Sequence, residues 1–309
     1  MRAHLSVLRL MMQRKNPTDF VLWKPKKEGE PSWTSPWGEG RPGWHIECSV
    51  MSKHHLGDTF DIHAGGEDLI FPHHENEIAQ SEAANGCTFA RYWLHNGFIT
   101  VDNEKMSKSL GNFFTVRDIA KHFPYEVIRF FILNGHYRSP INFSDELMKA
   151  CQNGLERIKN ARKELNFYIK NVADTKMTAE EAAKEAELNG YKEQFEAAMD
   201  DDFNTADAVS AIYELVRFSN TEIKAGASKE FAEKIQDMLD HLCGVLGVAE
   251  VAEEAVSDED VAKIEALIAE RTEAKKAKDF AKADAIRDEL AAMGITIKDT
   301  RQGVQWFRG

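Results

Sequence analysis

The chain has 309 residues and a formal net charge of −12, from 39 lysines and arginines against 51 aspartates and glutamates. At about 150 residues per domain, this length predicts roughly two domains and a sizeable core. No stretch approaches the ~20 apolar residues of a membrane span, and residues 1–12 lack the pattern of a secretory signal, so we expect no membrane association. Taken as an average, −12 argues against a nucleic-acid partner, because phosphates need lysine and arginine. Four scattered cysteines indicate reduced thiols of a cytoplasmic protein: Cys48, Cys87, Cys151 and Cys243.

The charge is unevenly distributed along the chain. Residues 1–173 hold 22 basic and 20 acidic residues, residues 174–260 hold 7 and 23, and residues 261–309 hold 10 and 8. The acidic runs of the middle block are typical of solvated helix faces. Because both flanking segments are slightly positive, the average does not exclude a nucleic-acid partner.

The first third is rich in Gly, Pro, Trp and His, which predicts short strands and helices joined by tight turns. One helix is expected to begin just after Pro42-Gly43. A strand is expected to run from Asp61 into a turn at the Gly65-Gly66 pair. A second helix is expected to carry Pro72 in its first turn.

From Ser144 onward the spacing of apolar residues becomes helical. Ser144 can cap the first helix, and residues 144–248 are expected to form an α-helical bundle. Val248–Ser257 is a plausible linker, and Val261–Met293 predicts one or two charged helices. Further expected helices are Tyr191–Met199, Thr205–Ile223 and Lys229–Leu246, and the expected short strands are Ile295–Ile297 and Val304–Phe307, with the turn at Arg301-Gln302-Gly303.

Three residues of the first third could bind a metal ion. His73 and Glu77 are four residues apart on one expected helix, so both can reach one point in space. With Cys48 they offer the N, O and S ligands that zinc accepts. From spacing alone, the more ordinary alternative stays open: His74 and Glu75 can be surface residues, and His45, His54 and His55 are expected to be structural.

A second group of residues is suited to phosphate. Lys105 and Lys108 flank a small polar loop and can meet negative charge on a phosphoryl group. The glycines at 65 and 66 allow a ligand to approach the backbone closely, although a plain turn accounts for them equally. Thr115 and Asp118 could cap the following helix.

The motifs that contain these residues resemble those of one family, the cysteinyl-tRNA synthetases. The loop at 105–109 reads KMSKS, the second signature loop of class I aminoacyl-tRNA synthetases. The segments RPGWHIECS, FDIHAGGEDLIFPHHENEIAQSE and EKMSKSLGNFFTVRD occur in the family's order. The resemblance runs from about Lys15 to Gly309, whereas Met1–Gln13 does not resemble the family.

This resemblance implies an α/β fold, a partial Rossmann-like class I catalytic half, over residues 1–143. An α-helical bundle would follow at 144–248, and a small mixed α/β anticodon-binding domain at 258–309. The family joins cysteine to ATP as cysteinyl-adenylate and then transfers the cysteinyl group to cysteine tRNA. A monomer with one Zn²⁺ per chain, and ATP with Mg²⁺ as substrate, is implied.

The resemblance also assigns roles to individual residues. Zinc would be bound by Cys48, His73 and Glu77; Trp44 would line the cysteine pocket with His63 beside it. Gly65, Gly66 and Asp68 would line the adenosine side, and Lys105 and Lys108 would hold the phosphates. The candidates for anticodon contact are Arg287, Asp299 and Trp306, where a buried anchor is an equal alternative for Trp306.

The chain also departs from the family pattern. No HxGH occurs in the 309 residues, and no cysteine occupies the place of the family's fourth zinc ligand. We therefore expect a truncated frame or fragment that cannot form the adenylate alone. A tRNA-binding fragment without catalysis is the second reading. A ligase acting on a small amine is the third, and the tail at 258–309 counts against it.

Overall fold

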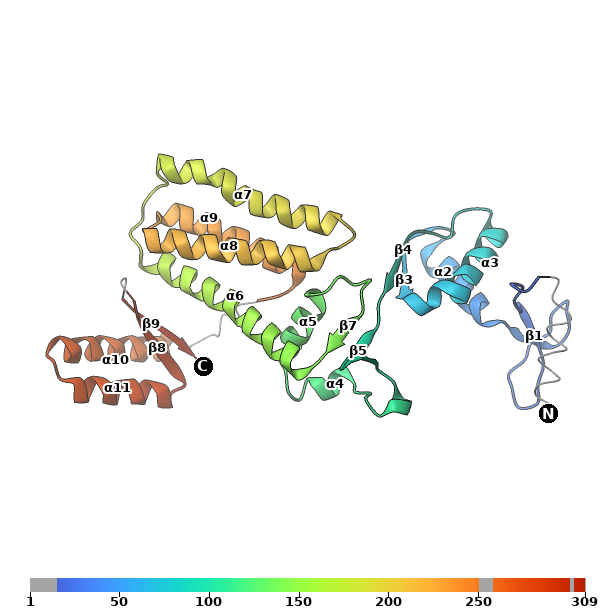
Figure 1. The fold of residues 1–309 in the computed structure, drawn as a ribbon, viewed down its shortest axis with the longest axis horizontal. Helices are drawn as coiled ribbons and strands as arrows, with labels where there is room; N and C mark the ends of the chain where they lie inside the picture. Colours follow the sequence, from blue (N-terminus) through green and yellow to red (C-terminus); the bar gives the residue numbers. More distant parts are fainter. Residues whose placement is uncertain (1–15, 250–257, 301–302, 309) are drawn as a thin grey trace. The chain divides into compact units, whose positions relative to one another are not determined.

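The computed structural model describes residues 16–249, 258–300 and 303–308. The chain divides into two compact units, coloured along the sequence in Figure 1. The first comprises residues 1–106 and 137–142, and the second comprises residues 107–136 and 143–309. Each unit is described by itself.

The first unit is built around a parallel pair of strands, β3 (Phe60–Gly66) and β4 (Ala90–Asn96), joined through the helix α3 (Glu75–Asn85). A parallel pair needs such a crossover, because a tight hairpin can join only antiparallel strands. The helix α2 (Trp44–Leu56) packs against α3. The remaining elements of this unit are β1 (Trp23–Pro25), β2 (Gly40–Pro42), η1 (Glu67–Leu69), η2 (Ile70–His74), β5 (Ile99–Val101) and β6 (Glu104–Lys105), and β5 lies between β6 and β7 (Ile141–Phe143).

Three sequence expectations for this unit can be checked. The helix that follows Pro42-Gly43 is confirmed, because α2 begins at Trp44. The strand includes both glycines of the 65–66 pair, and the turn comes after them in η1. The expectation that Pro72 lies in the first turn of a helix is confirmed: Phe71 is extended and interrupts η2, and the helical backbone then runs from Pro72 into α3, which is assigned from Glu75.

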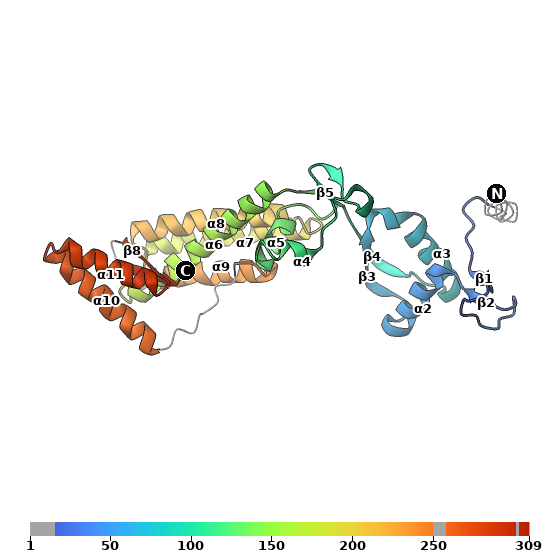
Figure 2. The ribbon, with the colours of Figure 1, turned by 90° about the horizontal axis from the view of Figure 1, so that it is seen from below.

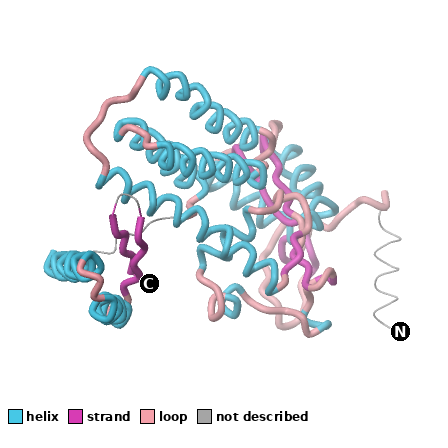
Figure 3. The backbone as a smooth tube through the Cα atoms, turned by 60° about the vertical axis from the view of Figure 1, so that its left-hand side comes forward, coloured by secondary structure: helices cyan, strands magenta, loops and turns pink. Residues whose placement is uncertain are grey.

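The second unit contains the expected helical bundle, α6 (Asp145–Asn171), α7 (Ala179–Asp200), α8 (Thr205–Ala225) and α9 (Lys229–Leu246). Figure 2 and Figure 3 show α6, α8 and α9 side by side, in agreement with their mutual contacts. The apolar faces that these helices turn toward one another bury large side chains. Each such burial stabilises the fold by about 1.5–3 kcal/mol. The fully buried ones include Leu155, Ile158, Leu165, Ile212, Leu215, Phe231, Ile235, Leu239 and Leu242.

Polar caps set where these helices begin. The Ser144 side chain accepts a hydrogen bond from the Leu147 amide, which confirms the expected cap of α6. The expected Thr115–Asp118 cap is also present at α4 (Val116–Ile119). α7 begins twelve residues before the expected Tyr191, because Thr178 and Glu181 form a capping box there. The other short elements are η3 (Lys108–Leu110) and α5 (Tyr125–Leu133).

The C-terminal part consists of α10 (Asp258–Lys276), α11 (Phe280–Ala292), β8 (Ile295–Thr300) and β9 (Gly303–Arg308). Its small core is formed by Ile264, Ile286, Leu290 and Ile295. The expected linker begins later than Val248, because Val248 and Ala249 are buried; its remainder, 250–257, lies outside the described residues, as do Arg301 and Gln302 of the expected turn. Among the described helices, none is long and apolar enough to cross a membrane.

Candidate functional site

The residues expected to bind metal and cysteine gather around one buried carboxylate in the first unit. Glu77 on α3 is only 5% exposed. His63 Nε2 lies 3.0 Å from its Oε2 and His45 Nδ1 lies 3.8 Å from its Oε1. The Cys48 thiol on α2 lies close enough to the same carboxylate for each group to influence the pKa of the other. Glu77 is therefore the centre of the site.

Side-chain hydrogen bonds between the two helices hold this arrangement. Gln80 on α3 donates to the His45 carbonyl oxygen, and to the Ser49 hydroxyl at 2.6 Å. Ser81 donates to the same hydroxyl at 2.6 Å. These contacts fix α2 against α3, so Cys48 and Glu77 face each other.

A chain of aromatic and imidazole rings continues from the ends of the parallel strands. The rings of His63 and His74 lie 4.7 Å apart, and His74 Nδ1 lies 2.8 Å from His95 Nε2. Trp93 packs on both His63 and His74, with centroids 4.7 and 5.2 Å away. The absence of a side chain at Gly65 allows this packing, since a Cβ there would lie 2.8 Å from His74 Cε1.

His73 lies beside the predicted cysteine pocket. Its ring centroid is 4.7 Å from that of Trp44 and 5.1 Å from that of His45. Trp44 in turn stacks on His45 at 5.6 Å. We call His45, Cys48, His63, His73, His74, Glu77 and His95 the Glu77 cluster.

Burial shapes the protonation of this cluster. Burial lowers the pKa of His45, His74 and His95, so these imidazoles are neutral at pH 7. Burial, reinforced by the Glu77 charge, raises the pKa of the Cys48 thiol. Burial would raise the pKa of Glu77 as well, but contacts with His63 and Cys48 outweigh it and lower that pKa. Neutral imidazoles beside an ionised carboxylate are suited to a cation.

Unsatisfied polar atoms support the same interpretation. His73 Nδ1 and His45 Nδ1 are buried without a hydrogen-bond partner, and Glu77 Oε2 has only the His63 imidazole, in poor hydrogen-bond geometry. Such atoms carry a desolvation cost unless a ligand satisfies them. Donor atoms of His63, His74 and Glu77 all lie within 4.8 Å of one another, without Cys48 or His73. Zinc accepts these N and O donors, and the predicted ligands Cys48 and His73 lie outside this compact set.

Sequence reasoning missed part of this cluster. His45, expected to be structural, contacts the site, and His74, considered as a surface residue, is buried. His95 was not singled out, because its place depends on the β3–β4 register, which pairs it with Gly65. The signal available for His45 was its position beside Trp44. Glu75 is exposed, as are His54 and His55, which contact only each other among the described rings.

The residues expected to bind ATP are only partly described. Gly66 allows the Asp68 carboxylate to approach, because a Cβ on Gly66 would meet it. Lys105 Nζ lies 4.9 Å from the centroid of the Phe98 ring. The side chain of Lys108 lies outside the described residues. The loop backbone after Lys105 is ordered by the Asn112 amide oxygen, which accepts from the Ser107 amide at 2.8 Å.

The three anticodon candidates differ in their surroundings. Arg287 pairs with Asp284 at 3.2 Å on the surface of α11. Asp299 accepts bonds from the buried Arg271 and from Lys275. Trp306 packs against the small C-terminal core, which favours the anchor interpretation.

An aromatic residue that the sequence reasoning missed is better exposed. Phe280, at the start of α11, is 63% exposed and follows Lys275, Lys276 and Lys278 along the chain. An exposed ring beside lysines is suited to stacking on a nucleic-acid base. The signal was the aromatic residue within a lysine-rich run.

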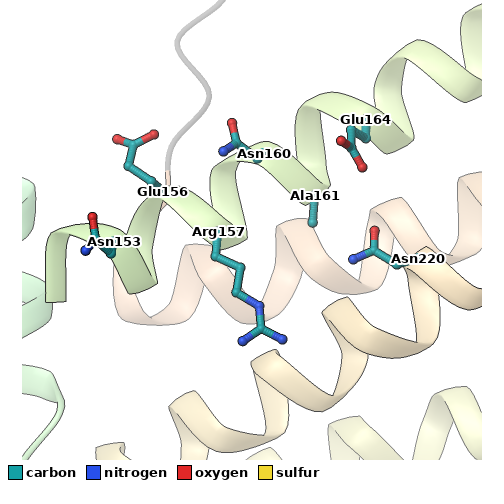
Figure 4. A pocket seen from close by; sticks show the side chains of 7 residues that line it. All are labelled: Asn153, Glu156, Arg157, Asn160, Ala161, Glu164 and Asn220. Carbon is teal, nitrogen blue, oxygen red and sulfur yellow. The ribbon is translucent and has the colours of Figure 1, made fainter. Parts of the chain in front are cut away.

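A polar hollow of about 360 Å³ lies between α6 and α8 (Figure 4). Arg157 is its single cation, against two carboxylates, so its charge does not favour phosphate. Its lining consists of Asn153, Glu156, Arg157, Asn160, Ala161, Glu164 and Asn220.

Comparison with known families covers most of the chain with three consecutive matches. Residues 3–153 match the tRNA synthetases class I (C) catalytic domain, and residues 194–250 match the DALR domain. Residues 258–306 match the cysteinyl-tRNA ligase anticodon binding domain. Successive parts of the chain are therefore similar to a class I synthetase catalytic domain, a DALR domain and a cysteinyl-tRNA ligase anticodon-binding domain.

Individual relatives agree with this assignment. The cysteine–tRNA ligase of Lachnospira eligens is 58% identical over 296 residues, which is 96% of this chain and 62% of the relative. That of Clostridioides difficile is 56% identical over 96% of this chain and 63% of the relative. The chain thus spans less than two thirds of the length of these relatives in the cysteinyl-tRNA ligase family.

A solved structure supports the class I fold. The LeuRS of Agrobacterium radiobacter K84, in a ternary complex with tRNA and LeuAMS, superimposes with a TM-score of 0.55 at 17% identity. The match covers 69% of this chain and 31% of that protein. At this identity the likeness concerns the fold alone, and the α/β fold class followed by helical domains is confirmed.

Proposed function

We propose that this chain serves the ATP-dependent attachment of cysteine to its tRNA through cysteinyl-adenylate, with zinc selecting the cysteine thiolate. The observation that carries the proposal is the buried Glu77 carboxylate, which joins the Cys48 thiol to imidazoles with unsatisfied nitrogens. The similarity to cysteine–tRNA ligases supports the reaction, and the cluster would supply the amino-acid specificity.

Cys48, His73 and Glu77 would hold the zinc ion, with His63 and His45 positioned against Glu77. A zinc ion there would bind the substrate thiolate far better than a serine hydroxyl. A hydrophobic pocket alone distinguishes similar substrates by only ~1–3 kcal/mol. A metal that binds the thiolate would therefore improve the selection of cysteine. The Trp44 indole, which is exposed, would cover the substrate side chain.

The remaining assignments complete the proposed reaction. Gly65, Gly66 and Asp68 would line the adenosine side of ATP. Lys105 and Lys108 would stabilise the charge of the leaving pyrophosphate, with Mg²⁺ accompanying the nucleotide. The attacking group would be the substrate carboxylate, so no covalent nucleophile of the protein is required.

Cysteine tRNA would be bound through the C-terminal residues 258–309. Arg287 and Asp299 remain candidates for base contacts, and Trp306 for a stacking or anchoring role. We add Phe280 as a stacking residue because of its exposure. We propose a monomer in the cytoplasm, where the four free thiols stay reduced.

Cobalt substitution tests the metal assignment. Cobalt(II) bound to the full chain should show a near-ultraviolet thiolate-to-cobalt band, and Cys48→Ser should remove it. Cys87→Ser, which alters an exposed thiol, is the matched control and should leave the band unchanged. A band that persists in Cys48→Ser would contradict the assignment.

A catalytically incomplete, tRNA-binding role is the second candidate. It is favoured by the match of residues 258–306 to a cysteinyl-tRNA ligase anticodon binding domain, which concerns tRNA binding and not the chemical step. An ATP–pyrophosphate exchange assay with cysteine on this chain separates the two. Robust exchange supports the complete reaction, whereas tRNA binding without exchange supports the second candidate.

A further inference from the structure

An exposed tryptophan-rich segment precedes the Glu77 cluster in the first unit. Residues 23–42, which we call the tryptophan hairpin, comprise β1, β2 and the loop that joins them. Trp37 is 78% exposed and Trp33 is 57% exposed. The Trp23 and Trp37 rings lie 6.3 Å apart at 51°. Exposed indoles gathered in one segment indicate a binding surface, because water is an unfavourable environment for them.

The backbone holds these rings in place. Trp33 and Gly40 exchange two backbone hydrogen bonds, at 2.7 and 3.0 Å. At the tip, the Ser35 hydroxyl donates to the Gly38 carbonyl oxygen at 2.7 Å and accepts from the Trp37 amide at 3.2 Å. A Cβ at Gly40 would collide with the Trp23 indole nitrogen, so glycine is needed for the indole to lie there. The platform is therefore ordered before any ligand arrives.

The charge beside the rings is suited to phosphate. Lys26 and Lys27 are exposed and Lys24 is half-buried, and none of the three forms a close ion pair within the described part of the chain. Two of the three acidic residues of the hairpin have partners, and the third, Glu28, is exposed. Glu30 pairs with Arg41 at 2.7 Å, and Glu39 accepts a hydrogen bond from Thr34. Aromatic faces beside free lysines are the features that bind single-stranded nucleic acid.

The hairpin is directly continuous with the Glu77 cluster. β2 ends at Pro42, and Gly43 then begins α2, whose first residue is Trp44. The Gly43 amide donates to the Leu22 carbonyl oxygen at 2.7 Å, which ties the start of β1 to the start of α2. A strand lying on the hairpin would thus end next to Trp44.

We propose that the tryptophan hairpin binds the unpaired 3′-terminal nucleotides of tRNA, with bases stacked on Trp33 and Trp37 and phosphates on Lys26 and Lys27. This inference rests on the proposed function, which requires the terminal adenosine to reach the cysteine site. A protein partner is the competing occupant, but the unpaired lysines favour RNA.

The test measures binding of the full chain to cysteine tRNA with an intact CCA end and to the same tRNA with CCA removed. The unaltered chain should bind the intact tRNA more tightly. Trp37→Ala and Trp33→Ala should each weaken that preference by roughly tenfold, the effect of losing one stacked base. Trp33→Phe and Trp37→Phe should each retain most of the preference for tRNA with an intact CCA end. Tyr125→Ala, which removes an exposed ring of α5, should retain the whole preference.

The outcomes separate this inference from the proposed function. If the chain binds neither tRNA, the proposed function fails. If it binds tRNA but Trp33→Ala and Trp37→Ala leave the CCA-dependent preference unchanged, only this inference is overturned. The emission of Trp33 and Trp37 can be isolated as the difference between the unaltered chain and the Trp33→Phe and Trp37→Phe variants. A blue-shifted difference in the free chain would show that the chain itself covers these indoles and would overturn the inference too.

Discussion

At the residue scale, Glu77 organises the proposed cysteine site, because its carboxylate lies beside Cys48, His63 and His45. The sequence predicted Cys48, His73 and Glu77 from ligand types and a four-residue spacing. The sequence did not predict that His45, His74 and His95 belong to the Glu77 cluster. Their membership depends on how α2 packs on α3 and on the β3–β4 register, which are tertiary features.

Replacing Glu77 should weaken zinc binding strongly. Glu77→Gln removes the negative charge while keeping the side chain's size, so zinc affinity should fall by at least about 100-fold. Competition with a chelator of known affinity measures the loss. Glu75→Gln is the matched control, because Glu75 is exposed and lies only two residues before Glu77. An equal loss of zinc affinity in this variant would contradict the assignment.

Asp299 should stabilise the C-terminal hairpin in a pH-dependent way. The Arg271 and Lys275 side chains lower the pKa of Asp299 to about 2 from its ordinary 3.8. Because the folded-state pKa is lowered, the stabilisation is complete above about pH 4 and is lost as the pH falls towards 2.

Asp299→Asn should therefore weaken the hairpin near neutral pH by about 1 kcal/mol, a modest value because half of the side chain is exposed. Hydrogen exchange of the β8 and β9 amides in the full chain measures this. The difference in amide exchange rate between Asp299→Asn and the unaltered chain should shrink below pH 4. A difference that grows on acidification would refute the ion-pair account.

At the element scale, caps and apolar periodicity account for the agreement between sequence and structure. α9 was predicted with its observed bounds, since Ser228 caps it and Gly247 ends it in a left-handed conformation. The first half of α7 was missed because the apolar spacing is weak there and a capping box starts the helix. The place of Pro72 in a first helical turn was predicted, whereas the kink at the extended Phe71 before it was not.

Glu181 joins two of these caps and should be important for bundle stability. Its carboxylate accepts bonds from the Thr178 and Ser228 amides, each at 2.7 Å, and it is buried. Glu181→Ala leaves both amides unsatisfied and should lower the free energy of unfolding by about 2 kcal/mol in urea titrations. Glu185→Ala, which removes only a half-exposed pair with Lys234, should cost about 0.5 kcal/mol. Equal losses in the two variants would show that the hydrogen bonds of Glu181 to the cap amides stabilise the bundle no more than an exposed ion pair does.

At the scale of the whole molecule, the net charge of −12 is misleading as an average. Its excess of acid lies in residues 174–260, and the runs that the structure describes, such as Asp200–Asp202, are exposed. Both flanking segments are close to balance. Contacts with RNA would therefore depend on a few local lysines and on exposed rings.

This distribution predicts a modest salt dependence of tRNA binding. With fewer than about five phosphates neutralised, a plot of log affinity against log salt should have a slope of magnitude below about 5. Titrations at several potassium chloride concentrations measure the slope. A steeper one would require a basic surface that the charge distribution does not supply.

The central claim is that the Glu77 cluster selects cysteine through a metal-bound thiolate. The most direct test is calorimetric binding of cysteine and of serine to the zinc-loaded chain, repeated after zinc removal. The account predicts that cysteine binds only in the presence of zinc and that serine binds at least 100-fold more weakly. Equal binding of the two amino acids, or cysteine binding that survives zinc removal, would contradict it.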